Sequence, residues 1–181
     1  WPFTGAEEDR AGGHARNIPV PAGFNDSEMA WVLHEAILPI VRHLRPQAIM
    51  IQCGADALEE DPLARLSLSN NSHRAVVAAV MGLAPRLIVL GGGGYNPWTV
   101  ARCWAGVWGT LNGFAMPDRL NDAAEAVLRA LTFHRAAGRN PPGHWFTTLV
   151  DAPRPGVVRA IVRRRAAAAR ADLPAPPAAV A

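Results

Sequence analysis

The sequence predicts an α/β fold built around a parallel sheet, and two apolar segments with the same layout carry that prediction. Residues 48–53 form an apolar run of strand length that continues into Gly54 and Asp56. Residues 87–90 form a second run, which four glycines and Tyr95 follow. Since a helical pattern lies between the two runs, they form a strand, helix, strand unit whose parallel strands end side by side.

The four glycines at residues 91–94 indicate a site at this edge of the sheet. Residues without a Cβ let a substrate lie against the main chain, at a cost in folding entropy. Ligands of open parallel sheets bind beyond the carboxyl ends of the strands, so Asp56 and Tyr95 are expected to share one rim. A dinucleotide loop is not expected, because its third glycine would fall on Asn96.

The elements before the first strand follow from proline positions and periodicity. Residues 1–17 lack a hydrophobic period and are expected to be loop, and residues 17–21 to be a short edge strand, because two prolines would remove donors from a central one. Residues 26–44 carry apolar side chains at three- and four-residue steps, which predicts a helix capped by Asp26 or Ser27.

Two further helices flank the second strand. One begins among the capping residues 69–72 and ends near Gly82. The other follows the glycine loop, with Asn96 as its cap and Pro97 in its first turn. Its buried stripe is expected to consist of Val100, Trp104, Val107, Trp108 and Leu111.

The remaining residues predict small helices and a tail. Residues 122–131 and the basic segment 155–170 are helical candidates, residues 139–143 form a turn, and the proline- and alanine-rich residues 171–181 are expected to be a disordered tail. Three strands with about five helices leave a sheet edge uncovered. We therefore expect this chain to be the carboxyl-terminal part of something larger.

Composition limits the function classes. The 181 residues suffice for one domain, half of them are apolar, and no apolar run reaches membrane-span length or resembles a signal peptide, so a cytoplasmic protein without a membrane partner is expected. All 18 basic residues are arginine at a net charge of only +3, so no nucleic-acid partner is expected. Cys53 and Cys103 are expected to be reduced and buried. The six histidines show no metal-ligand spacing, and His34, His43 and His73 are expected on the surface.

The residues alone leave the roles of the two rim side chains open. Asp56 either caps a turn or serves as a metal ligand or catalytic acid, and its place after a buried strand and a glycine weighs the two about equally. Tyr95, the one tyrosine of the chain, either packs or presents its hydroxyl to a ligand. Trp104 and Trp108, one turn apart, are expected to be core.

Four motifs together resemble the carboxyl-terminal half of the histone deacetylase family; they are residues 52–58, 61–63, 91–95 and 101–104. The resemblance implies a three-layer arginase/deacetylase-like α/β fold with a parallel sheet, present here as the carboxyl-terminal part only. It covers residues 1–113, leaving residues 114–170 as a helical extension before the tail. The segments 1–5 and 17–21 resemble most the bacterial acetoin-utilisation (AcuC-like) branch.

In this family, a zinc ion held by two aspartates and a histidine hydrolyses acetyl-lysine-type amides, with a histidine pair as general base and acid. By motif, Asp56 matches the second zinc aspartate and Tyr95 the tyrosine that stabilises the oxyanion. The resemblance implies zinc or another divalent metal such as iron, and also potassium. It implies as substrate partner an acetylated lysine on a protein or a small acylated amine.

The same motif match implies the walls of a substrate tunnel. Gly93 and Gly94 match part of the wall, Leu63 an apolar residue at the mouth, and Trp1 the aromatic that flanks the acyl-lysine stem.

Three features depart from the family pattern. Nothing in the sequence reproduces the histidine pair or the Asp-x-His zinc motif of the amino-terminal half, so the chain alone is expected to be inactive. Glu59 and Glu60 stand where relatives more often have small residues, and His14 lies near a position that is often tyrosine in potassium-binding members. The alternative is a non-catalytic α/β interaction module that retains the deacetylase fold.

Overall fold

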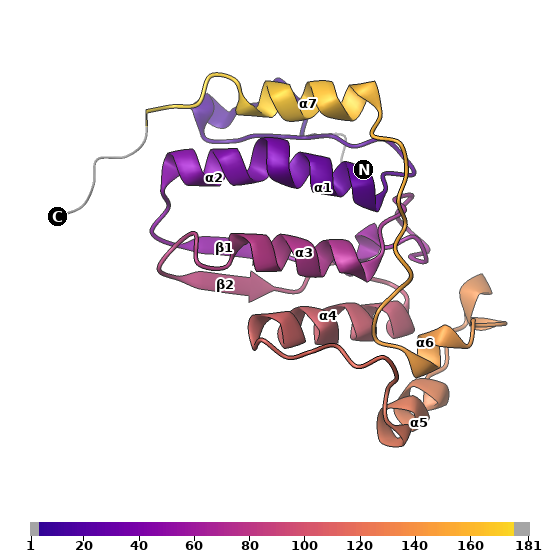
Figure 1. The fold of residues 1–181 in the computed structure, drawn as a ribbon. Coiled ribbons are helices and arrows are strands. Elements are labelled where there is room, and N and C mark those ends of the chain that lie inside the picture. The colour runs from indigo at the N-terminus through magenta and orange to yellow at the C-terminus, as the bar shows by residue number, and fades with distance from the viewer. Residues whose placement is uncertain (1–3, 176–181) are drawn as a thin grey trace.

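The sheet in the described part of the chain consists of two parallel strands. The computed structural model describes residues 4–175, apart from the side chain of Ala137. Strand β1 (Ile49–Gln52) pairs with β2 (Leu87–Leu90) so that Ile49 lies opposite Leu87 and Gln52 opposite Leu90. Helix α3 (Asn70–Val80) connects them, which confirms the predicted unit (Figure 1).

The two faces of this sheet differ. Ile51 and Val89 face a cluster with Val77 of α3 and Val107 of α4 (Pro97–Leu111), and these two helices pack against each other. On the opposite face the alternate residues Met50, Ile88 and Leu90 are 67%, 50% and 45% exposed. The described residues thus cover one face of the sheet with helices and leave an apolar face open to solvent.

The cap of the first long helix lies one residue before the predicted caps. Helix α1 (Asp26–Val32) is capped by Asn25, whose side-chain oxygen accepts a hydrogen bond from the Glu28 N–H, while the Glu28 carboxylate accepts from the Asn25 N–H. The prediction of Asp26 or Ser27 was wrong because Asp26 is used elsewhere. Its carboxylate accepts hydrogen bonds from Ser69 and Ser72 at the start of α3.

The helix continues to residue 44 with one wider turn in the middle. A π-helical segment (Leu33–Ile37) separates α1 from α2 (Leu38–Leu44). Pro39 has no N–H to donate, and its ring would press on the carbonyl four residues earlier. The wider turn accommodates the proline without ending the helix.

Residues 17–21 do not form the predicted edge strand. Ile18 and Val20 pack against the cluster formed by α1, the π-helical segment and α7, and the Pro19 carbonyl accepts a hydrogen bond from Arg165. Pro19 and Pro21 cannot donate to a ladder, so side-chain packing replaces strand pairing here.

The carboxyl-terminal helices pack at opposite ends of the molecule. Helix α7 (Ala160–Arg170), shorter than predicted, lies on α1 and the π-helical segment (Figure 1). Helices α5 (Asp122–Ala130) and α6 (His144–Thr147) pack around Trp98 of α4. Short 3₁₀ turns occur at Ala11–Gly13, Ala55–Ala57 and Ala136–Gly138. Within residues 4–175 we find no helix that is long and apolar enough to cross a membrane.

The buried face of α4 is not the predicted apolar stripe. Of that stripe only Val107 is fully buried, whereas Trp104 is 36% and Trp108 is 59% exposed, so the placement of both tryptophans in the core was wrong. The helix instead buries Trp98, Cys103 and Arg102. Arg102 is accommodated because its guanidinium lies 2.7 Å from the buried Asp151 carboxylate and donates to the Thr148 carbonyl.

We expect replacement of Glu28 by Gln to reduce the loss of folding stability between neutral and acidic pH. The buried Glu28 carboxylate takes a bidentate pair of hydrogen bonds from Arg159, which holds its pKa below the ordinary value of 4.5. A carboxylate whose pKa is lower in the folded than in the unfolded state stabilises the fold at pH values above its unfolded-state pKa. That stabilisation is lost as the pH falls through its folded-state pKa. Urea unfolding at pH 7 and at about pH 3 should show a smaller difference for Glu28→Gln than for the native chain. Equal differences would contradict the ion-pair assignment.

Candidate active site

The ends of β1 and β2 meet at one rim of the sheet, and backbone hydrogen bonds continue past both strands. The Cys53 N–H donates to the Leu90 carbonyl at 2.8 Å, and the Ala55 N–H donates to the Gly93 carbonyl at 2.6 Å. The turn that carries Asp56 is therefore joined directly to the glycine loop.

The two backbones approach so closely that side chains are excluded between them. A Cβ on Gly92 would lie 2.8 Å from the Cα of Gly54, and a Cβ on Gly93 would overlap the Asp56 carboxylate. Gly94 has a φ of +145°, and a Cβ there would lie 2.5 Å from a methyl of Val100. These contacts explain why the loop needs glycine.

Asp56 lies on the 3₁₀ turn at the end of β1, half-buried, with its carboxylate against Gly93 and Gly54. Hydrogen bonds among the described residues do not engage this carboxylate, which leaves its oxygens free for a ligand. Within residues 4–175 there is no group of three His, Cys, Asp or Glu side chains able to hold a metal ion. Asp56 can therefore supply one ligand of a metal site but not the site itself.

Tyr95 follows the glycine loop, with a side chain that is 47% exposed. Its backbone N–H donates to Asp61 Oδ2 at 2.7 Å, and the next residue, Asn96, caps α4 as predicted. The main chain of Tyr95 is thus held at the rim while its side chain stays exposed.

Leu63 is linked to Tyr95 because the backbone N–H groups of both residues donate to the carboxylate of Asp61. Its side chain is 55% exposed, and its backbone N–H donates to Asp61 Oδ1 at 2.8 Å. Gly93 and Gly94 connect the two rim residues, since Gly93 touches Asp56 and Gly94 precedes Tyr95. Of the tunnel residues expected from the motifs, Trp1 lies outside the described residues.

Three side chains at the rim were not anticipated from the sequence. Asp61 ties Leu63 to Tyr95. His73, expected on the surface, is half-buried and donates from Nε2 to the Gly54 carbonyl at 2.8 Å, while its buried Nδ1 has no partner among the described residues. Trp104 donates to the Cys53 carbonyl at 2.9 Å and lies against Gly91. Asp61 and Trp104 belonged to recognised motifs, at residues 61–63 and 101–104, without a role assigned to them, whereas His73 gave no signal beyond its position.

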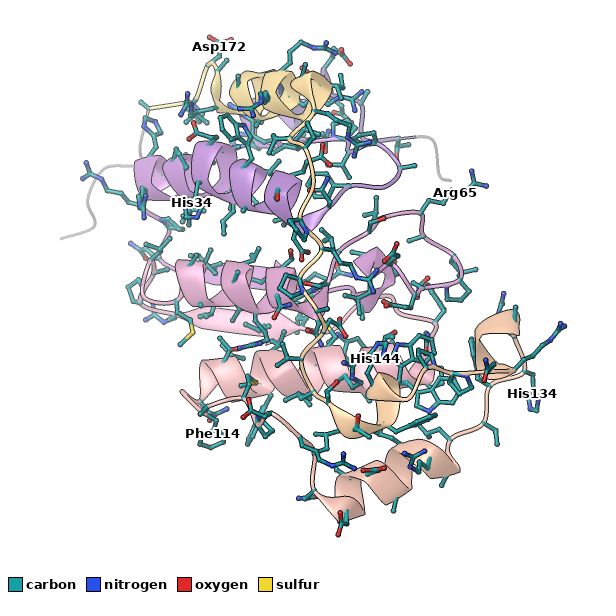
Figure 2. The ribbon with its side chains drawn as sticks, turned by 45° about the vertical axis from the view of Figure 1, so that its right-hand side comes forward. His34, Arg65, Phe114, His134, His144 and Asp172 are labelled. Carbon is teal, nitrogen blue, oxygen red and sulfur yellow. The ribbon has the colours of Figure 1, made fainter. Side chains whose placement is uncertain are left out.

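Three other histidines lie on different elements of the chain. Figure 2 shows His34 on the first long helix, His144 on α6 and His134 in the connection between α5 and α6. Among the described residues, they form no metal-ligand group with Asp56.

Both cysteines are buried and unpaired, as predicted. Burial raises the pKa of Cys53 and raises that of Cys103 to about 12. Burial and a raised pKa both disfavour the thiolate, which is the nucleophilic form of cysteine.

A cavity of about 210 Å³ lies beside the end of β1, lined by residues that include Met29, Gln52, Gly54 and His73. Asp56 and Tyr95 do not line it. This cavity is therefore not a space between Asp56 and Tyr95.

A family model described as the histone deacetylase domain matches residues 1–111. The chain belongs to the histone deacetylase family. A histone deacetylase-like amidohydrolase from Pseudomonas aeruginosa is 37% identical over 134 residues, covering 68% of this chain and 35% of that protein. A putative histone deacetylase 2 from Caenorhabditis elegans is 36% identical over 124 residues, covering 66% of this chain and 24% of that protein.

Solved histone deacetylase homologues share the fold. A crystal structure of a homologue from Aquifex aeolicus matches with a TM-score of 0.84 and 33% identity, covering 94% of this chain and 47% of that one. A homologue complexed with SAHA matches with a TM-score of 0.83 and 32% identity, covering 93% and 46%. These matches confirm the predicted arginase/deacetylase-like α/β fold. The chain spans less than half the length of these relatives.

We expect Gly93→Ala to disturb the rim. The added methyl overlaps the Asp56 carboxylate, and such overpacking typically costs about 1–3 kcal/mol. Thermal unfolding should show a lower midpoint, and the Asp56 carboxyl resonance should shift in NMR spectra. Gly143→Ala is the matched control, because nothing lies within 4 Å of its Cβ position. Equal behaviour of the two variants would contradict the close approach.

Proposed function

We propose that this chain is the carboxyl-terminal part of a metal-dependent deacetylase domain that hydrolyses acetyl-lysine-type amides. The observation that carries the proposal is the placement of Asp56 and Tyr95 at adjacent strand ends, in a member of the histone deacetylase family. A carboxylate and a phenol on one rim can act on the two sides of a single amide carbonyl.

Asp56 is proposed as one ligand of a zinc or another divalent ion. Its oxygens are not engaged by hydrogen bonds among the described residues, and the absence of a Cβ at Gly54 and Gly93 leaves room for the carboxylate at this position. The remaining ligands are proposed to come from residues outside this chain, because the described residues contain no group of three His, Cys, Asp or Glu side chains able to hold a metal ion. A bound zinc polarises a substrate carbonyl and activates water.

Tyr95 is proposed as the residue that stabilises the developing oxyanion. Its N–H is fixed by a buried carboxylate, and its phenol is exposed at the rim. A hydroxyl held in advance donates to negative charge in the transition state without needing to reorganise. Gly93, Gly94 and Leu63 are proposed to border the acyl chain.

The exposed apolar face of the sheet supports the proposal that this chain is part of a larger domain. Met50, Ile88 and Leu90 present apolar surface on strands whose other face is packed, and exposed apolar patches of this kind mark interaction surfaces. We propose that the rest of the deacetylase domain covers this face and supplies the missing ligands, and that the chain alone is inactive. The same face is the observation that favours the alternative, a non-catalytic interaction module.

The finer assignments are also part of the proposal. The sequence of residues 17–21 supports the proposal that the protein belongs to the bacterial acetoin-utilisation branch. Its proposed substrate is an acetylated lysine of a protein or a small acylated amine. A structural relative was solved in complex with SAHA, which supports ligand binding by a domain of this fold.

The test uses a complete domain, in which this chain follows the amino-terminal half of a deacetylase, its own or that of the Pseudomonas aeruginosa relative. We expect Asp56→Asn to remove the bound metal and turnover together, because the amide keeps the shape but loses the charged ligand. Metal content by mass spectrometry and hydrolysis of an acetyl-lysine peptide measure both. Asp118→Asn, at an exposed position, is the control. Full metal content and turnover in Asp56→Asn would contradict the ligand role, and a metal-free, inactive native domain would favour the interaction module.

Tyr95→Phe in the same domain should lower kcat and spare KM and folding. Loss of one oxyanion donor costs roughly 10²–10³ in kcat. Steady-state kinetics and a thermal melt distinguish this from a loss of structure. An unchanged kcat would refute the oxyanion role.

A further inference from the structure

Asp61 is a buried carboxylate whose charge is met by backbone N–H groups. It is 5% exposed, and among the described residues it takes part in no ion pair. Oδ2 accepts from the Tyr95 N–H at 2.7 Å, while Oδ1 accepts from the N–H groups of Leu63 and Ala64 at 2.8 and 3.3 Å. A buried charge without a counter-ion requires such hydrogen bonds.

Each oxygen of this carboxylate holds a different segment. One oxygen fixes the residue that follows the glycine loop, and the other fixes the turn that carries Leu63. Hydrogen bonds to a charged acceptor are stronger than neutral ones, so the two segments are held firmly in relation to each other. No other side chain among the described residues hydrogen-bonds to both.

The glycine loop needs this anchor because it has no side chains of its own to pack. Gly94, next to Tyr95, has a φ of +145°, and glycine costs the most conformational freedom on folding. A second tie lies beside the first, where the Asn96 side chain donates to the Glu60 carbonyl at 3.2 Å. The loop therefore depends on the segment 60–64 for its position.

We propose that Asp61 is a positioning residue that sets the Tyr95 hydroxyl and the Leu63 side chain relative to each other. Asp61 thereby couples the contact of Leu63 with the acyl chain to the stabilisation of the oxyanion by Tyr95. This inference rests on the proposed function of Tyr95 and Leu63. The hydrogen bonds that carry it do not.

Replacement of Asp61 by Asn separates the two ties. Asparagine has one acceptor oxygen and an NH₂ group that only donates. That NH₂ must face either the Tyr95 N–H or the N–H groups of residues 63–64, so one tie is lost. Asp26→Asn is a matched control, since Asp26 also accepts backbone N–H groups, of Ser69 and Arg154, away from the rim.

The first measurement uses the chain as it stands. Amide hydrogen exchange by NMR should speed up at Tyr95, or at Leu63 and Ala64, by about tenfold or more in Asp61→Asn, as expected for loss of a hydrogen bond to a charged group. Asp26→Asn should speed exchange at Ser69 and Arg154 instead. Unchanged exchange at all three rim amides would overturn the proposal. If Asp61→Asn does not fold, Asp61→Glu, which keeps the charge but displaces the oxygens, is expected to show the same change, and native exchange there would overturn it.

The second measurement uses the complete domain and a double-mutant cycle. Asp61→Asn should lower kcat by about tenfold or more when Tyr95 is present and by much less in the Tyr95→Phe background, because a positioning residue acts through the hydroxyl. A merely structural role would give the same loss in both backgrounds and would overturn the proposal. An active domain in which Tyr95→Phe has no effect would refute the proposed function, while the exchange result would still decide whether Asp61 holds the loop.

Discussion

The close approach of two backbone segments past the ends of β1 and β2 is the constraint on which the site depends. Gly92 lies over Gly54, and Gly93 lies over Asp56, with no space for a Cβ at either place. The hydrogen bond between Ala55 and Gly93 holds this contact. Because the segments are this close, Asp56 and Tyr95 emerge at one rim, and any larger residue in the loop would separate them.

Buried and half-buried acids organise the irregular parts of the chain around this contact. Asp26 holds the start of α3, Asp61 holds the rim, and Asp151 pairs with Arg102 while accepting from the Asn70 N–H. Each carboxylate joins segments far apart in sequence by accepting main-chain N–H groups that have no ladder partner. The loops of the site are therefore fixed without extending the sheet, which leaves the rim open to a ligand.

Much of the fold followed from local patterns, whereas features set by distant contacts did not. The apolar runs, the glycine loop and the side-chain cap at Asn96 specify β1, β2 and α4 through short-range geometry. Helix α3 begins after Ser69 as expected, but the Ser69 hydroxyl donates to Asp26 and does not cap the helix. Residues 17–21 were mistaken for a strand because an extended segment with prolines has the same sequence pattern whether it pairs with a sheet or packs through its side chains. Trp108 was placed in the core because its spacing matches a helical stripe, yet α4 buries Arg102 instead, whose partner Asp151 lies 49 positions later. Asp56 and Tyr95 were found from their strand ends, but Asp61 was not, since only the folded chain brings Tyr95 to it.

The most direct test of this account is a crystal structure of the complete domain with zinc and an acetyl-lysine peptide, with the metal located by anomalous scattering. The account predicts a metal bonded to Asp56 at about 2.0–2.2 Å, and the Tyr95 hydroxyl within hydrogen-bonding distance of the acetyl oxygen on the same carbonyl. A metal bound away from Asp56, or a Tyr95 hydroxyl directed away from the peptide, would contradict it.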